Sequence, residues 1–227
     1  MSQNPVAVIV AHPDDEVLAF GGTICRHVQR GDDVTIAFLA TGLAARNSDG
    51  RINSDDLAKL RQDARAATKI LGVTDVVFGD FPDNRMDKVA LLDVIKAVLD
   101  VGEKSRATTI YTHHIGDLNI DHEVVARAVL TAFRPLPGAR IRRIYAGEVI
   151  SSSEYSLPDS RFHPNTYVPI GAYLDRKCDA LMRYSSEIRK WPHPRSVEAV
   201  RHLAGLRGSE CGEAAAEALL LMRQVIE

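Results

Sequence analysis

Short apolar and β-branched runs alternate with longer segments of helical periodicity over the first two thirds of the chain. The short runs predict strands, and apolar residues spaced three and four apart predict helices. The predicted strands are 5–11, 33–40, 75–79, 107–112 and 142–150. The predicted helices between them are 17–29, 55–71, 87–101 and 121–133. This alternation indicates an α/β fold with a largely parallel sheet flanked by helices on both faces, because parallel strands need crossover connections and are buried on both sides.

The alternation weakens after about residue 151, where serine and proline become frequent. An edge strand is predicted at NTYVPI, residues 165–170, and helices are predicted near 171–183 and 212–225. Repeats, low-complexity tracts and linkers are absent from the sequence. We therefore expect one domain over residues 1–227, with a core at 5–150 and a C-terminal part, 151–227, that packs on the core and helps to form the pocket.

Charge and hydropathy narrow the class of partner. The chain has 28 basic and 30 acidic residues and a formal net charge of -2, so no global field attracts nucleic acid or an anionic membrane. A small molecule or a glycan is the expected partner, and the oligomeric state, including a homo-oligomer, is left open. Without a membrane-spanning apolar run or a signal-peptide pattern, we expect a cytoplasmic protein. Three widely spaced cysteines with no CxxC pattern argue against a disulfide framework.

The first segment rich in chemistry is AHPDDE at 11–16, directly after the first predicted strand. Ligands of open parallel sheets bind beyond the carboxyl ends of the strands, so this loop is well placed for a site. His12 and Asp15, three residues apart, could both face one metal ion and leave Asp14 for another task. Alternatively, the acids only favour the positive end of the following helix.

The second segment is THHIGDLNIDHE at 112–123, which follows the fourth predicted strand in the same way. His122 would complete a two-histidine, one-aspartate zinc set and leave a fourth position open for water. Alternatively, His122 only packs in the first turn of a helix. Two strand-end clusters of carboxylates and imidazoles are harder to explain by accident than one, which favours a shared metal site.

The HPDDE motif, followed about a hundred residues later by a DLNxDH loop, resembles the PIG-L (LmbE-like) deacetylase family over at least residues 5–150. The resemblance implies a Rossmann-like fold and a zinc enzyme that hydrolyses N-acetyl groups of amino sugars and glycoconjugates. It also implies that His12, Asp15 and His122 are the ligands of one Zn²⁺ per chain and that Asp14 is the general base. A site of this composition also accepts iron, cobalt or manganese.

The resemblance further implies an arginine that contacts the substrate, and LRQDARAA at 60–67 supplies Arg61 at that place. The alternative for Arg61 is a solvated charge on a helix. The loop at 41–51 follows the second strand, and Arg46 or Asn47 could contact sugar hydroxyls there. A surface loop without a binding role is the competing interpretation.

One position departs from the pattern of the family. A histidine that polarises the carbonyl is usual three residues before the last ligand, and this chain has Asn119 there. Asparagine donates a hydrogen bond but carries neither a proton to transfer nor a positive charge. We expect the catalytic donor role to be shared among zinc, Asn119 and one of His113 or His114. Asp121 is predicted to orient a ligand or to start the helix.

Weaker candidates complete the expected site. Asp117 and His113 are candidate substrate contacts from the second loop, and Asp83 and Arg85 are candidates after the third strand. An aromatic and basic group within KWPHPRS could close the pocket or only anchor packing. Its members are Trp191, His193 and Arg195.

These observations predict a hydrolase in which metal-activated water attacks an N-acyl group while Asp14 accepts the proton. The alternative within enzymes is a zinc amidase that acts on a non-sugar N-acyl compound such as a cysteine conjugate. A nucleotide-binding module is disfavoured, since HPDDEVLAFGG replaces the glycine-rich fingerprint after the first strand and its acids would repel a pyrophosphate.

Overall fold

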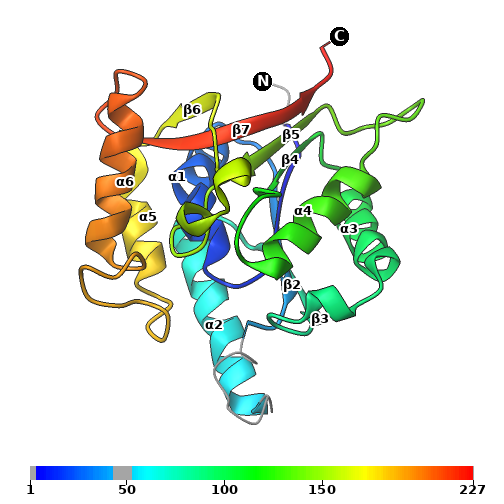
Figure 1. The fold of residues 1–227 in the computed structure, drawn as a ribbon, viewed down its shortest axis with the longest axis horizontal. Helices are drawn as coiled ribbons and strands as arrows, with labels where there is room; N and C mark the ends of the chain where they lie inside the picture. The colour runs from blue at the N-terminus through cyan, green and yellow to red at the C-terminus, as the bar shows by residue number, and fades with distance from the viewer. Residues whose placement is uncertain (1–3, 43–52, 227) are drawn as a thin grey trace.

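The computed structural model describes residues 4–42 and 53–226, and a seven-stranded sheet forms the centre of this part of the chain. The strands lie in the order β3-β2-β1-β4-β5-β7-β6 (Figure 1). Strands β1 to β5 pair in parallel, whereas β7 runs antiparallel to both β5 and β6. The bounds are β1 Val6–Val10, β2 Val34–Ala40, β3 Asp75–Phe81, β4 Thr109–His113, β5 Arg143–Gly147, β6 Thr166–Pro169 and β7 Ala216–Gln224.

Helices cover both faces of the sheet, as predicted. One face carries α1 (Asp15–Gln29), α2 (Ser54–Leu71), α5 (Leu174–Leu181) and α6 (Val197–Ser209). The other carries α3 (Leu91–Ser105) and α4 (Ile120–Ala132). Short 3-10 turns lie at Met86–Lys88, Ser153–Tyr155, Pro158–Ser160 and Gly171–Tyr173. No helix of the described part of the chain is long and apolar enough to span a bilayer.

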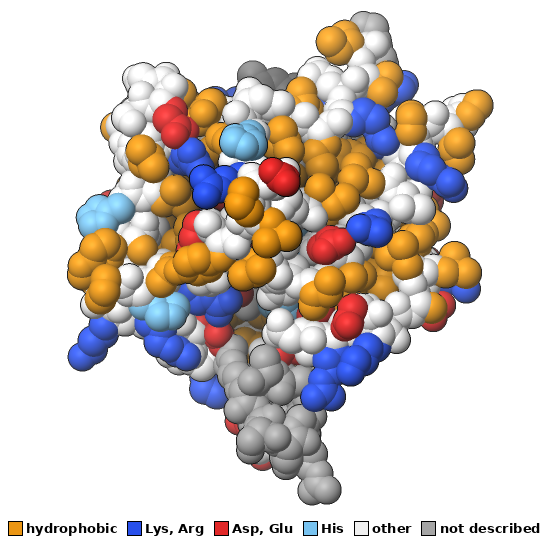
Figure 2. All heavy atoms as spheres, viewed as in Figure 1, with side chains coloured by type: hydrophobic (Ala, Val, Ile, Leu, Met, Phe, Trp, Pro, Cys, Tyr) orange, Lys and Arg blue, Asp and Glu red, His pale blue; other side chains and the backbone are white. Residues whose placement is uncertain are grey.

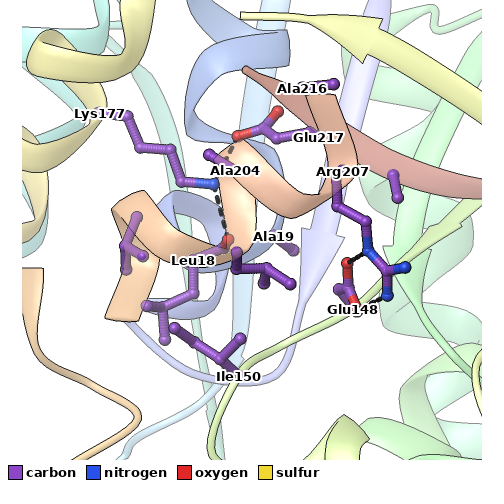
Figure 3. A pocket seen from close by; sticks show the side chains of 12 residues that line it. Leu18, Ala19, Glu148, Ile150, Lys177, Ala204, Arg207, Ala216 and Glu217 are labelled. Atoms are coloured by element: carbon purple, nitrogen blue, oxygen red, sulfur yellow. Dashed lines mark hydrogen bonds and ion pairs between the residues drawn. The ribbon is translucent and has the colours of Figure 1, made fainter. Parts of the chain in front are cut away.

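The C-terminal third is where the predicted elements and the structure disagree. The predicted edge strand at 165–170 is confirmed as β6, but the predicted helix at 212–225 is wrong, because this segment forms β7. Helix α6 was not predicted. Alanine, glutamate and leucine dominate AEALLLMRQ and favour a helix intrinsically, yet the gap between β5 and β6 offers backbone partners on both sides. Glu217 is also buried there against Lys177 and α1 (Figure 3).

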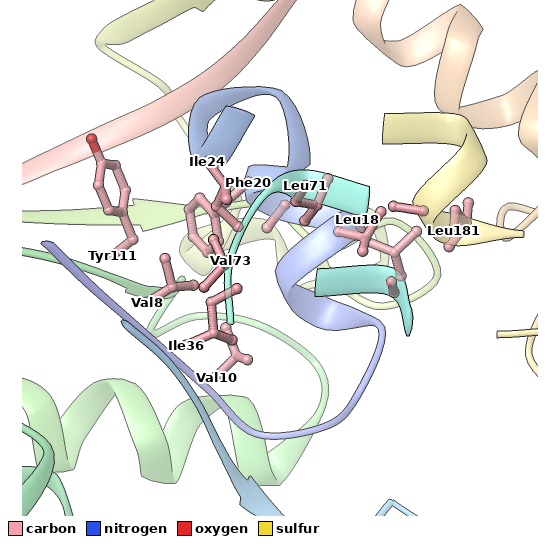
Figure 4. Close-up of a cluster of buried hydrophobic side chains, with 14 of the residues drawn as sticks. Val8, Val10, Leu18, Phe20, Ile24, Ile36, Leu71, Val73, Tyr111 and Leu181 are labelled. Atoms are coloured by element: carbon pink, nitrogen blue, oxygen red, sulfur yellow. The ribbon is translucent and has the colours of Figure 1, made fainter. Parts of the chain in front are cut away.

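Helix α1 is buried on almost every side, because the sheet lies under it and α5 and α2 pack against it. Figure 4 shows the resulting core, in which Phe20 and Ile24 of α1 and Ile36 of β2 belong to one cluster of buried side chains. The approach is closest at Gly22, where an added Cβ would lie 2.4 Å from Ile170. A glycine is therefore required if the segment after β6 is to contact α1 so closely.

The surface carries no large region of one charge on the face shown in Figure 2, where acidic, basic and hydrophobic side chains are interspersed. This distribution agrees with the formal net charge of -2. All three cysteines are free, with Cys25 and Cys178 buried.

Candidate active site

The two loops singled out in the sequence meet because β1 and β4 are neighbours in the sheet. The strand order runs 3-2-1 in one direction and 4-5 in the other, so the crossovers diverge between β1 and β4. Open α/β sheets bind ligands at such a switch point, beyond the carboxyl ends of the strands. His12 and Asp15 follow β1, and His122 lies in the first turn of α4, after β4.

Three predicted ligands converge at this place. His122 Nε2 lies 3.3 Å from Asp15 Oδ2, and His12 Nδ1 lies 3.4 Å from the same oxygen. One donor atom from each of the three residues falls within 4.8 Å of the others, and all three residues are buried. Tetrahedral zinc with bonds of about 2.1 Å holds its ligand atoms about 3.4 Å apart, so these spacings suit a zinc ion.

The hydrogen bonding of these residues also favours a cation. Asp15 Oδ1 and His122 Nε2 are buried, and within the described residues neither has a hydrogen-bond partner. Such atoms cost free energy unless something pairs with them. A divalent metal ion would satisfy both, because carboxylate oxygen and imidazole nitrogen are its usual ligands. The donor set therefore fits the zinc that the motif implies.

A second acidic group lies on the other side of His12. Its Nε2 is 2.9 Å from Asp121 Oδ2 and 3.1 Å from Asp83 Oδ1. Asp121 also accepts hydrogen bonds from the backbone N–H groups of Asn84 and Met86. Both of its oxygens are thus in use, so we interpret this group as an orienting hydrogen bond to His12 and not as a second metal site.

Buried acids control the protonation of the two imidazoles. Burial disfavours the charged form of His122, but Asp15 and Asp117 outweigh it and raise the pKa of His122 to about 9. The pKa of His12 is likewise raised, by Asp121, Asp15 and Asp83 against the effect of burial. The acids therefore favour a positive charge at this place, which is the electrostatic environment that attracts a cation.

Asp14 stands beside this group in a strained backbone conformation. Its φ angle is 111°, which L-residues rarely adopt, and its backbone N–H donates to Glu16 Oε2 at 3.0 Å. Burial raises the pKa of the Asp14 carboxyl to about 6, although the cation of Arg195 opposes this. At neutral pH the carboxylate is mostly ionised, and its pKa is close enough to the pH of the solution for it to accept a proton during a reaction. Strain of this kind is frequent at functional sites.

Arg195 reaches the site from the C-terminal third. Its Nη1 lies 3.2 Å from Asp14 Oδ2 and 3.1 Å from Glu187 Oε2, and its Nε donates to Ser151 Oγ at 2.7 Å. The sequence placed Arg195 only in a possible pocket-closing group, without a partner. Of the other members of that group, Trp191 is 54% exposed, and its ring lies perpendicular to that of His202. His193 accepts a hydrogen bond from the backbone of Arg195.

The loop after β4 holds His122 in place. Asp117 Oδ1 lies 3.2 Å from His122 Nδ1, and the hydroxyls of Ser152 and Ser153 donate to Asp117 Oδ2. His113 is fully buried, stacks on His122 with ring centroids 3.8 Å apart, and accepts the N–H of Ala11 at Nε2. The structure thus places Asp117 and His113 against the ring of His122, which they hold in position.

The two candidate donors of this loop differ in availability. Asn119 caps α4, and its Oδ1 accepts the N–H of Asp121 at 2.9 Å, which leaves its amide NH₂ as a donor. His114 Nε2 lies 2.7 Å from the carbonyl oxygen of Ser160. Asn119 is partly exposed whereas His114 is buried, so Asn119 is better placed to reach a bound molecule.

Two arginines, Arg61 and Arg46, were predicted to contact the substrate. Arg61 Nη2 lies 2.6 Å from Asp80 Oδ1 and 3.2 Å from the Gly79 carbonyl, and its guanidinium lies over Phe78. In this arrangement Arg61 belongs to the contact between α2 and β3. Arg46 and Asn47 lie outside the described residues.

Sequence reasoning missed the buried pair of Glu16 and Tyr184. The Tyr184 hydroxyl donates to Glu16 Oε1 at 2.6 Å, and burial raises the pKa of Glu16 to about 8. Glu16 belongs to the HPDDE motif, but nothing in the sequence connects it with a tyrosine 168 positions later.

Comparison with known proteins identifies the family of this chain. Residues 7–133 match the family described as "PIG-L: GlcNAc-PI de-N-acetylase", and the chain belongs to this family. A probable N-acetyl-alpha-D-glucosaminyl L-malate deacetylase 2 of Bacillus cereus is 28% identical over 188 residues, which cover 80% of this chain and 83% of the relative.

Solved structures share the fold at lower identity. The N,N'-diacetylchitobiose deacetylase from Pyrococcus horikoshii has a TM-score of 0.77 at 19% identity, covering 96% of this chain and 83% of that chain. The 4-carboxy-2-hydroxymuconate hydratase GalB from Pseudomonas putida also has a TM-score of 0.77, at 22% identity, covering 98% of each chain. Because a deacetylase and a hydratase share this fold, the activity has to be argued from the site.

Proposed function

We propose that this protein is a zinc-dependent hydrolase that removes an N-acetyl group from an amino sugar or a glycoconjugate. The observation that supports it most is the convergence of His12, Asp15 and His122 with an ionisable Asp14 beside them. Membership of the PIG-L family and the similarity to a probable glucosaminyl malate deacetylase support the reaction and the sugar. The amide bond and one water would yield acetate and a free amine.

In this proposal His12, Asp15 and His122 hold the zinc ion, and Asp121 and Asp117 orient the two imidazoles. When bound, zinc lowers the pKa of a coordinated water and polarises an acyl oxygen. Iron, cobalt and manganese also bind to two imidazoles and a carboxylate, and zinc is the native metal that we propose.

Asp14 acts as the general base and then as the general acid. Its carboxylate takes a proton from the attacking water and passes that proton to the amine nitrogen, since an amine leaves more readily when it is neutral. Arg195, 3.2 Å from Asp14 Oδ2, keeps the carboxylate ionised before the reaction and fixes its orientation. The amide NH₂ of Asn119 donates to the oxyanion, a contact that typically contributes about 3 kcal/mol.

The test is acetate release from a panel of N-acetylated amino sugars, sugar nucleotides, aminoglycosides and acylated cysteine conjugates by the zinc-loaded protein. We expect release from a sugar compound. Release from cysteine conjugates alone would replace the sugar deacetylase with the amidase alternative. A zinc-loaded protein that releases no acetate from any member would contradict the proposal.

A further inference from the structure

A second hollow lies at the opposite end of the sheet, and we call it the basal pocket. Its floor includes Thr109 and Arg143, the first residues of β4 and β5, and one wall is the C-terminal end of α1. Strand β6 supplies the other wall, and the hollow has a volume of about 280 Å³. It lies at the amino ends of the parallel strands, whereas the candidate metal centre lies at their carboxyl ends.

In the part of the chain that the structure describes, the basal pocket shares no lining residue with the candidate metal centre. Helix α1 connects the two, since it begins at Asp15 and ends next to Arg30. Fifteen residues at 1.5 Å per residue separate the two places by about 22 Å along the helix axis. A ligand in the basal pocket is therefore not an extension of the substrate proposed above.

Positive charge collects in the basal pocket without matching acids. Arg26, Arg30 and Arg143 line it, and no aspartate or glutamate of the described ranges does. Arg26 donates to the Pro169 carbonyl at 3.3 Å, but across the described residues none of the three arginines forms an ion pair with a carboxylate. Asp32 is close to this region, yet its oxygens accept from His27 Nδ1 and from the backbone N–H of Asn4.

A structural role explains only part of this charge. Arg26 and Arg30 stand at the C-terminal end of α1, where cations favour the helix dipole. Arg143 comes from β5 and has no such reason to face the same hollow. Cations around a concavity focus a positive potential, and a guanidinium group can pair with two phosphate oxygens at once.

The floor of the basal pocket adds an aromatic surface. Tyr145 is half-buried and its ring stacks on Tyr111 at a centroid distance of 5.3 Å and an interplanar angle of 15°. Tyr111 is fixed in turn, because its hydroxyl lies 2.8 Å from His27 Nε2. A rigid, partly exposed ring next to cations suits a ligand that has a planar ring as well as negative charge.

We propose that the basal pocket binds a phosphate-bearing ligand with a planar ring, of the size of a nucleoside monophosphate. The arginines pair with the phosphate and Tyr145 stacks on the ring. The volume is near the lower limit of small-ligand pockets, about 300 Å³, which favours a mononucleotide over a dinucleotide. This inference does not depend on the deacetylase activity.

The test is calorimetric titration of the full chain with adenosine monophosphate, inorganic phosphate and adenosine, with a chelator present so that phosphate cannot bind to a metal ion. We expect one nucleotide per chain, bound more tightly than phosphate or adenosine. R143Q should weaken nucleotide binding about tenfold, the effect of one lost charge-assisted contact. R183Q, which removes an exposed arginine outside the basal pocket, should leave it unchanged.

Two outcomes would overturn the proposal. Nucleotide binding that R143Q and R183Q change equally would mean that the basal pocket is not the site. If phosphate binds as tightly as the nucleotide and Tyr145→Leu has no effect on binding, the pocket recognises the phosphate alone and not a planar ring. Thermal melts followed by circular dichroism show whether a variant that no longer binds is still folded. For the wild-type protein, weaker nucleotide binding at higher salt supports the role of the arginines.

Discussion

Helix α1 contacts two buried groups of charged side chains, one at its N-terminus and one on the side that faces α5 and β7. In the second group, Lys177 Nζ donates to Glu217 Oε1 at 2.7 Å and to the Leu18 carbonyl at 2.9 Å (Figure 3). Glu217 also accepts the N–H groups of Gly22 and Thr23. Both charges are thus paired and hydrogen-bonded within the chain.

The candidate metal centre is equally buried but is not satisfied in this way. Asp15 Oδ1 and His122 Nε2 have no hydrogen-bond partner among the described residues, and Asp14 has a strained φ angle. The two buried charge clusters thus differ in how far their polar atoms are paired within the described residues. The satisfied cluster joins β7 and α5 to α1, whereas the unsatisfied cluster leaves donor atoms available for the metal ion and the substrate that we propose.

The largest effect is expected at the unsatisfied cluster. Asp14→Ala removes the proposed general base and should lower kcat by about 10²- to 10⁴-fold. Acetate release measures the rate, and elemental analysis should show an unchanged zinc content, because Asp14 is not among the proposed ligands. Asp55→Ala, at an exposed acid in the first turn of α2, is the control and should keep the rate. Equal activity of the two variants would exclude Asp14 from catalysis.

The satisfied cluster should respond in stability and not in chemistry. Lys177→Met leaves Glu217 buried without its cation and should lower the free energy of unfolding by about 3–5 kcal/mol, as measured by urea denaturation. Its matched control is Arg201→Met, which breaks the exposed pair with Asp175 and should cost about 0–1 kcal/mol.

A double variant sharpens this result. Lys177→Met with Glu217→Met removes both buried charges and should recover part of the lost stability. If Lys177→Met destabilises the protein no more than Arg201→Met does, the buried pair is not the contact that holds α5 to β7.

A smaller effect is expected at Asp117, which contacts the proposed metal ligand His122. Asp117→Asn weakens the contact with His122 Nδ1 and should reduce zinc affinity by about 10- to 100-fold, as measured by competition with a fluorescent chelator. Glu123→Gln, at a partly exposed residue next to the same ligand, is the control. Unchanged zinc affinity in Asp117→Asn would show that the serine-bound carboxylate does not orient His122.

The smallest effect is expected at Arg195. Arg195→Gln removes the cation that lies beside Asp14, and kcat/KM should fall by about tenfold while zinc content stays constant. Arg195→Lys should restore part of the activity, since it keeps the charge but loses the forked geometry. Arg189→Gln changes an exposed arginine of the same segment and should be silent. A loss of zinc in Arg195→Gln would instead indicate a structural role.

Much of the fold followed from local patterns. Strands β1 and β2 are short, buried apolar runs, and α2 ends at Gly72, whose φ angle of 94° suits glycine. The predicted helix at 87–101 exists but lies at Leu91–Ser105, after a 3-10 turn. The segment 212–225 was predicted as a helix because its alanines and leucines favour one, and the open edge of β5 determines instead that it is a strand.

The sequence by itself determined where the candidate site lies, because the histidines and aspartates stand immediately after predicted strands and strand ends gather at one edge of a parallel sheet. It could not determine the supporting contacts. Tyr184 on Glu16, Arg195 on Asp14 and the collected arginines of the basal pocket join residues more than a hundred positions apart. Such pairs depend on how the strands are ordered and on where the last two strands join the sheet, and local propensity carries no information about either.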